Sequence, residues 1–184
     1  MLNKLNVISK EVEKVLSHVN EEEINNLVQE LCNADRIFIV GMGRSGLVGK
    51  MFAMRLMHSG YDVYAVGETI TPNIDKNDLL VIISGSGNTA NLISYAKKAK
   101  EMNAITALIT TNKDAIIGKI SELTVILPAA TKKRLPDEPK TIQPLGSQFD
   151  QSAHLLLDGI IVELIESHCK NDSEKMIKKH TNLE

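Results

Sequence analysis

The stretch that decides the fold is RIFIVGMGRSG, residues 36–46. An apolar run at 36–40 leads directly into GMGRSG at 41–46, and a helical pattern follows at 45–59. Glycines at this spacing let a strand turn tightly into a helix and let backbone N–H groups approach a phosphate. The stretch therefore predicts a βαβ unit with an anion-binding turn, and taken alone it is typical of dinucleotide-binding proteins.

Strand-like and helix-like segments alternate outward from this turn. Apolar runs predict strands at 36–40, 62–66, 79–83, 105–109 and 123–127. Helical periodicity predicts helices at 5–19, from Asn20 onward with an Asn20/Glu23 capping box, and at 45–59, 88–103, 114–120 and 147–168. Such alternation predicts an α/β fold, a doubly wound five-stranded parallel sheet of flavodoxin-like order 2-1-3-4-5 flanked by helices.

Length and composition indicate one globular domain. The 184 residues are 43% apolar, with a net charge of −2, 3% aromatic residues and no Trp, which argues against nucleic-acid or anionic-membrane binding. We expect a single domain over 1–184, made of N-terminal helices (1–34), sheet core and long helix (35–168) and a tail (169–184). Charged residues interrupt the first helical pattern, so we expect no signal peptide or membrane span. We expect a cytoplasmic protein in which Cys32 and Cys169 are reduced core residues.

A second glycine-rich loop, ISGSGNT at 83–89, follows the third predicted strand and precedes a helix. In the order 2-1-3-4-5, the loops after strands 1 and 3 flank one crevice, so both should converge on one ligand. Three hydroxyl groups within six residues suit a compact phosphate on a polyhydroxylated molecule. The alternative is that Ser86, Asn88 and Thr89 only cap and begin the helix. The loop residues expected to bind substrate are Gly43, Arg44, Ser45, Ser84, Gly85, Ser86, Gly87, Asn88 and Thr89.

Glu68 keeps the dinucleotide alternative open. It lies about twenty residues beyond Gly46, where a ribose-binding acid would sit. However, the second loop has no role in a dinucleotide site. Glu68 is therefore also a candidate for binding sugar hydroxyls, with a solvated loop residue as the alternative.

Five motifs resemble those of the sugar isomerase (SIS) domain family, and within it the 6-phospho-3-hexuloisomerases. They are GMGRSG (41–46), AMRLMHSGYDVYAVGETITP (53–72), DLLVIISGSGNT (78–89), QPLGSQFDQS (143–152) and KKHTNLE (178–184). The resemblance implies interconversion of D-arabino-3-hexulose 6-phosphate and fructose 6-phosphate, the second step of formaldehyde fixation by the ribulose monophosphate pathway. It implies no metal or organic cofactor and a homotetramer with active sites between subunits. It also implies functional coupling to 3-hexulose-6-phosphate synthase.

Asp150 is the candidate catalytic base for moving the carbonyl from C3 to C2 through a cis-enediol. It occupies the position where the family usually carries glutamate in G-[ST]-x-F-E, and here the motif reads GSQFD. Aspartate is one methylene shorter, which puts full activity in doubt. The alternative is that Ser147 and Asp150 form a capping box for the long helix.

His58 and His180 are the candidate residues for assisting ring opening. His58 lies thirteen residues beyond Ser45, roughly 20 Å along a helix, so it should act on a neighbouring subunit's ligand. The alternatives are a helix-end histidine and a surface residue of the tail. In the proline-rich loop at 128–146, the basic run 132–134 either attracts an anionic substrate or is a solvated charge run, which is the interpretation we adopt.

Three other functions stay open on the sequence alone. A non-catalytic phosphosugar sensor gains support from Asp150, but such regulators usually carry a fused DNA-binding domain, and only about 35 residues precede the first strand. Another phosphosugar aldose-ketose isomerase is a rival within the same class. A dinucleotide-dependent oxidoreductase would have to retain NAD(P).

Overall fold

The sheet of the protein is fully parallel, as the sequence predicts. A computed structural model describes residues 1–167, 176–177, 179–180 and 182. The strands are β1 (Ile37–Gly41), β2 (Val63–Ala65), β3 (Leu79–Ile83), β4 (Ile105–Thr110) and β5 (Leu123–Ile126). Their order is β2-β1-β3-β4-β5, which confirms the doubly wound α/β class. The carboxyl ends of β1 and β3 are neighbours, because Gly41 pairs with Ile83.

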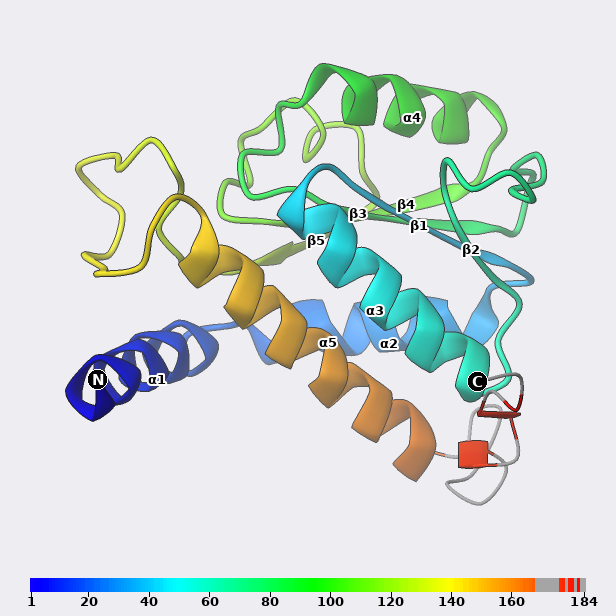
Figure 1. Ribbon diagram of the computed structural model, residues 1–184. Coiled ribbons are helices and arrows are strands. Elements are labelled where there is room, and N and C mark those ends of the chain that lie inside the picture. Colours follow the sequence, from blue (N-terminus) through cyan, green and yellow to red (C-terminus); the bar gives the residue numbers. More distant parts are fainter. Residues whose placement is uncertain (168–175, 178, 181, 183–184) are drawn as a thin grey trace.

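Helices cover both faces of this sheet. They are α1 (Leu2–Leu16), α2 (Glu21–Asn33), α3 (Arg44–His58), α4 (Ala90–Glu101) and α5 (Ser147–Glu166). Figure 1 shows α4 alone on one face, with α2, α3 and α5 on the other. α1 packs against α5, and its first half extends away from the body, where Leu2 and Leu5 are exposed.

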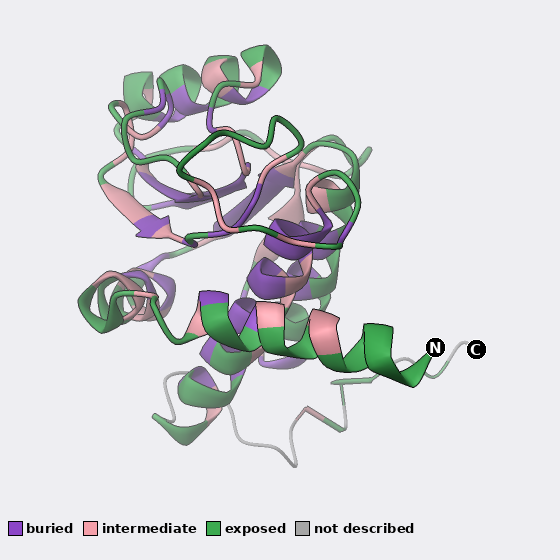
Figure 2. Cartoon of the chain, turned by 90° about the vertical axis from the view of Figure 1, so that its left-hand side faces the viewer, coloured by how far each residue is buried: buried purple, intermediate pink, exposed green. Residues whose placement is uncertain are grey.

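Alternation along the strands divides the core into two layers. In β3, Leu79, Val81 and Ile83 belong to the cluster beneath α2, α3 and α5, whereas Leu80 and Ile82 belong to the cluster beneath α4. Residues of a strand point alternately to opposite faces, so a sheet covered on both sides needs an unbroken apolar strand. Figure 2 shows this buried layer between exposed helix surfaces.

The segment 114–120 differs from the helix that its sequence predicts. Residues 114–120 form consecutive turns and no helix. A Cβ on Gly118 would lie 2.5 Å from the carbonyl oxygen of Lys113, and the Asn88 side chain accepts a hydrogen bond from the Ile116 amide. The segment thus folds onto the β3 loop instead of following its own periodicity.

Asn20 caps α2 as predicted, since its side chain accepts a hydrogen bond from the Glu22 amide at 2.8 Å. The reciprocal half of the capping box is absent. The Glu23 carboxylate instead accepts from the Ile126 amide at 2.8 Å, which joins α2 to the edge strand β5.

The expectation of a reduced Cys32 is wrong, because Cys32 is disulfide-bonded. The apolar helical pattern around Cys32 predicts that the residue packs against the core, and it does. The pattern carries no information about the oxidation state of the thiol. Cys169 lies outside the described residues. Among the helices that the structure describes, none combines the length and apolar character needed to cross a bilayer.

Candidate active site at the carboxyl edge of the sheet

The first glycine-rich turn is built by close backbone contact. A Cβ on Gly46 would lie 2.6 Å from the carbonyl oxygen of Gly41, and a Cβ on Gly41 would lie 2.9 Å from the amide nitrogen of Gly46. No residue with a side chain therefore fits at either position. Gly43 has φ +58, a value that favours glycine, and it is the N-cap of α3. These glycines place Arg44 and Ser45 in the first turn of α3, at the carboxyl end of β1.

The second loop is clamped to the strand beside it. The hydroxyl groups of Thr110 and Thr111 donate to the carbonyl oxygen of Gly85 at 3.1 and 2.8 Å. Gly87 has φ +60, and its amide bonds to the buried hydroxyl group of Ser84 at 3.2 Å. These hydrogen bonds hold the loop against the end of β4.

Helix capping does not account for the polar residues of this loop. Thr89 is the N-cap of α4, but its side chain makes no capping hydrogen bond. Asn88 donates to the carbonyl oxygen of Ser86 at 3.0 Å and accepts from the Ile116 amide. Thr89 thus occupies the N-cap position, as the capping alternative expects, but its hydroxyl group leaves the N-terminal amides of α4 without a side-chain cap.

Asp150 is held against the first turn of α3. Its Oδ1 accepts a hydrogen bond of 2.7 Å from the Ser45 hydroxyl group, and its Oδ2 lies 3.5 Å from Nε of Arg44. The N-cap of α5 is Gly146, and no side chain caps this helix. The capping-box alternative for Ser147 and Asp150 is therefore wrong.

Asp150 is ionisable and buried, with 6% of its surface exposed. Burial raises the pKa of Asp150 above the ordinary aspartate value, because the charged form loses solvation. The hydrogen bond from Ser45 and the charge of Arg44 lower the pKa and offset part of this rise. A carboxylate whose pKa is moved toward neutrality is suited to accept and return a proton.

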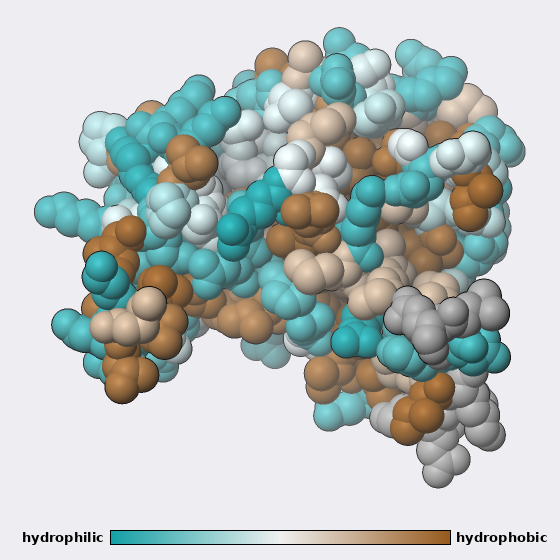
Figure 3. Space-filling view, in the orientation of Figure 1, coloured by the Kyte–Doolittle hydropathy of each residue, from teal (hydrophilic) through white to brown (hydrophobic). Residues whose placement is uncertain are grey.

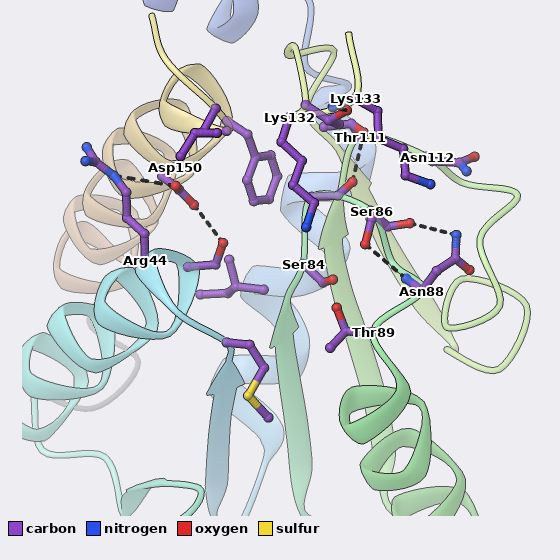
Figure 4. A pocket seen from close by; sticks show the side chains of 18 of the residues that line it. Arg44, Ser84, Ser86, Asn88, Thr89, Thr111, Asn112, Lys132, Lys133 and Asp150 are labelled. Atoms are coloured by element: carbon purple, nitrogen blue, oxygen red, sulfur yellow. Dashed lines mark hydrogen bonds and ion pairs between the residues drawn. The ribbon is translucent and has the colours of Figure 1, made fainter. Parts of the chain in front are cut away.

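These elements surround a cavity of about 500 Å³, a volume suited to a small metabolite. Figure 4 shows Asp150 and Arg44 on one side, with Ser86 and Thr89 on the other. The sequence-predicted residues that line the cavity are Arg44, Ser45, Ser84, Gly85, Ser86, Asn88, Thr89 and Asp150. Both glycine-rich loops therefore meet at one cavity, together with the predicted base.

The loop at 128–146 forms one wall of the cavity. Lys132 and Lys133 line the cavity, and the Lys132 side chain points into it between Asp150 and Ser86. Both lysines are solvent-exposed, as expected of a solvated charge run, and they also border the cavity, so the alternative of attracting an anionic substrate stays a prediction. The available signal was the length of the loop, since long irregular loops often carry function. The cavity is also lined by residues that no sequence motif marks, namely Thr111, Asn112, Thr131, Glu138 and Phe149.

Three of the predicted binding residues do not line the cavity. Gly43 and Gly87 shape the two loops through positive φ and leave their neighbours to form the lining. Glu68 follows the edge strand β2, beyond β1, and its carboxylate pairs with Lys50 at 2.5 Å. Being on the far side of β1 from β3 keeps Glu68 away from the cavity.

The two histidines also lie away from this cavity. His58 is buried at the far end of α3, and its ring stacks on that of His180 with centroids 5.3 Å apart. Burial lowers the pKa of His58, and the nearby His180 and Arg55 lower it further. The role expected for His58 and His180, on a neighbouring subunit's ligand, stays a prediction.

Metal binding finds no support in the described part of the chain, where no three or more His, Cys, Asp or Glu side chains converge on a possible metal site. The site combines two glycine-rich loops with a buried carboxylate at the carboxyl edge of the sheet, in a doubly wound α/β protein. The chain belongs to the SIS domain family, whose defining pattern matches residues 30–141. This confirms the resemblance found in the sequence motifs.

Full-length relatives narrow the family further. A Bacillus subtilis (strain 168) protein named 3-hexulose-6-phosphate isomerase is 41% identical, covering 96% of this chain and 95% of the relative. A Mycobacterium gastri protein of the same name is 36% identical, covering 99% and 90%. A crystal structure from Methanococcus jannaschii, described as inferring that function, has a TM-score of 0.85 at 35% identity and covers 99% of each chain.

Proposed function

We propose that this protein is an isomerase that interconverts D-arabino-3-hexulose 6-phosphate and fructose 6-phosphate. The observation that carries the proposal is the buried carboxylate of Asp150, which faces the loop at 84–89 across a cavity of about 500 Å³. Relatives covering nearly the whole chain bear the name of this activity. The reaction is the second step of formaldehyde fixation through ribulose monophosphate.

The chemistry is a proton transfer between neighbouring carbons. In the forward direction the Asp150 carboxylate removes the proton from C2. The C2–H electron pair forms the C2=C3 bond of a cis-enediolate, and the π pair of the C3 carbonyl moves onto its oxygen. A proton passes from the C2 hydroxyl group to the oxygen on C3. Asp150 then returns its proton to C3, which leaves the carbonyl at C2 and balances the reaction without net oxidation.

The phosphate end of the substrate has a separate binding region. We assign it to the loop at 84–89, where hydroxyl groups and the uncapped amides of α4 are donors. Ser45 has a more restricted role than a phosphate donor, because its hydroxyl proton is already directed at Asp150. Binding energy from the phosphate then holds C2 beside the carboxylate.

The assembly is a homotetramer in this proposal. Exposed apolar side chains on α3 and α5 include Met51, Met54, Leu155 and Val162. Figure 3 shows apolar and hydrophilic surface interspersed over these two helices. Exposed apolar side chains on neighbouring helices favour a protein contact on this side of the molecule. A neighbouring subunit on this face would bring its histidines toward the cavity, and a 3-hexulose-6-phosphate synthase would supply the substrate.

Sedimentation analysis of the Met54→Glu variant tests the assembly, with Lys97→Glu on the exposed side of α4 as the control. The tetramer is expected to dissociate in the first variant only. A monomeric wild-type protein would contradict the assembly.

A coupled assay tests the activity. The protein is mixed with ribulose 5-phosphate, formaldehyde and a 3-hexulose-6-phosphate synthase, and fructose 6-phosphate is followed through phosphoglucose isomerase and glucose-6-phosphate dehydrogenase. Asp150→Asn should lose at least about a hundredfold in kcat while still binding fructose 6-phosphate. Glu101→Gln, an exposed carboxylate at the end of α4 that pairs with Lys98, should keep full activity.

The second candidate function is a phosphosugar sensor without catalysis. The observation that favours it is aspartate at position 150, where the isomerase motif usually has glutamate. No turnover by the wild-type protein, together with a higher melting temperature in fructose 6-phosphate, would decide for the sensor.

A further inference from the structure

Glu11 is an acidic residue of α1 whose carboxylate binds the end of the loop at 128–146. Its Oε2 accepts hydrogen bonds from the Thr141 hydroxyl group at 2.5 Å and from Nε2 of Gln143 at 2.9 Å. Its Oε1 accepts from the Ile142 amide at 2.9 Å. Three consecutive loop residues, about 130 positions away in the sequence, are thus fixed by one side chain.

The bound end of the loop is connected to the cavity wall. Gln143 is buried, and its Oε1 accepts a hydrogen bond from Gln151 of α5, one residue beyond Asp150. The guanidinium group of Arg134 donates to the carbonyl oxygen of Gln143. Arg134 directly follows Lys132 and Lys133, so the position of Gln143 is coupled to the segment that places these lysines in the cavity.

Two further side chains fix the remainder of the loop, the carboxylate of Glu138 and the side-chain amide of Gln148. Glu138 accepts from the Thr131 hydroxyl group at 2.5 Å and from its amide at 2.9 Å, which closes the loop on itself. Gln148 of α5 accepts from the Ala130 amide at 2.8 Å, which fixes the start of the loop. The lysine-bearing segment lies between these anchors, and only the Glu11 anchor comes from α1.

Charge supports the same arrangement. Burial alone would raise the pKa of Glu11, but the hydrogen bonds from Thr141, Gln143 and Ile142 and the charge of Arg134 lower it overall. Glu11 is therefore ionised at neutral pH, and charge-assisted hydrogen bonds to an ionised acceptor are stronger than neutral ones.

We propose that Glu11 is a positioning residue for the site: it fixes the loop at 128–146 so that Lys132 stays in the cavity and attracts the anionic substrate. This proposal rests on the proposed function for the nature of the substrate. In this proposal Lys132 binds substrate, intermediate and product alike, because the charge of the phosphate group does not change during isomerisation. Loss of the anchor should accordingly raise KM and leave kcat nearly unchanged.

The Glu11→Gln variant removes the charge and one acceptor with little change in shape. An amide nitrogen in place of Oε1 faces the Ile142 amide, and in place of Oε2 it faces Nε2 of Gln143. At least one loop donor thus loses its acceptor in either orientation, since Oε1 accepts from the Ile142 amide and Oε2 accepts from both Thr141 and Gln143. Glu13→Gln is the matched control, because Glu13 is exposed on the same helix.

Two measurements test the proposal. Hydrogen exchange should become faster at the amides of 131–143 in Glu11→Gln and stay unchanged in Glu13→Gln. KM should rise by about tenfold in Glu11→Gln. The apparent affinity falls in proportion to the fraction of molecules in which the loop holds Lys132 in the cavity. In a Lys132→Ala background, Glu11→Gln should add little to KM, because both changes remove the same interaction.

Each outcome has one meaning. Unchanged exchange at 131–143, or equal effects of Glu11→Gln on KM with and without Lys132, would overturn the proposal. A wild-type protein that neither turns over nor binds sugar phosphates would remove the proposed function. In that case, direct titration of each variant with inorganic phosphate replaces KM, and weaker binding in Glu11→Gln alone would still support the role of Glu11.

Discussion

The hydroxyl group of Ser45 donates a hydrogen bond of 2.7 Å to Asp150, across 105 positions of sequence. Ser45 comes from the turn between β1 and α3, and Asp150 comes from the first turn of α5. The bond fixes one carboxylate oxygen at the first turn of α3, and Arg44 lies beside the other oxygen. The orientation of the proposed base is thus set by the same turn that the sequence marks as anion-binding.

Replacing Ser45 by alanine should shift the pH dependence of kcat/KM. The hydrogen bond from Ser45 lowers the pKa of Asp150, so its loss should raise that pKa further and move the acidic limb to higher pH. Loss of orientation should also reduce kcat, by up to about a hundredfold. The pH–rate profile measures both, with Ser17→Ala at the end of α1 as the control. An unshifted limb would mean that another group titrates.

Asp150 should also reduce stability at neutral pH. Its folded-state pKa is raised above the unfolded value, so the folded protein favours the protonated form. Its favourable contribution is present below the unfolded pKa and is lost as pH rises through the folded pKa. Asp150→Asn should therefore have a higher melting temperature than wild type at pH 7.5, and the difference should shrink toward pH 4. A lower melting temperature at pH 7.5 would contradict this.

The side chain of Thr89 should serve ligand binding and not helix stability. Because it makes no capping hydrogen bond, Thr89→Ala should leave urea unfolding nearly unchanged while raising KM about tenfold through loss of one donor to a charged group. Asn20→Ala is the opposite case, because Asn20 does cap α2 and its loss should cost about 1 kcal/mol without changing KM. Similar behaviour of the two variants would argue against a ligand-binding hydroxyl group at Thr89.

Two glycines should respond in opposite directions to replacement by alanine. Gly87 has φ +60, and a Cβ there would lie 2.5 Å from Cβ of Ala115, so Gly87→Ala should destabilise by about 1–3 kcal/mol. Gly159 lies inside α5, and a Cβ there meets nothing within 4 Å. Gly159→Ala should therefore stabilise by about 0.5–1 kcal/mol. Equilibrium denaturation in urea measures both.

Local pattern predicts the sheet well because the central strands β1 and β3 are continuous apolar, buried runs. The run at 79–83 coincides with β3. The convergence of the two glycine-rich loops follows from the strand order, because β1 and β3 are neighbours. Residues 114–120 could not be predicted in the same way. Their helical periodicity is overridden by the tertiary hydrogen bond between Asn88 and Ile116.

The site was only partly predictable for a related reason. Asp150 was identified through its motif, yet its bond to Ser45 depends on how α5 crosses α3. Lys132 is exposed as its charge run indicates, but the run carries no information about which cavity the loop borders. Glu68 was placed near the ligand by its distance from Gly46 in the sequence, but β2 is an edge strand and carries it away.

The position of α5 has a consequence for folding. This helix follows every strand, and it supplies Phe149, Leu157 and Ile160 to the core layer beneath α2 and α3. Contacts between distant segments form slowly, because a long stretch of chain must be ordered first. A nascent chain that has completed its sheet would therefore expose an unfilled apolar face and lack the Asp150 carboxylate. Catalytic competence and closure of the core should appear in the same final step, when α5 docks.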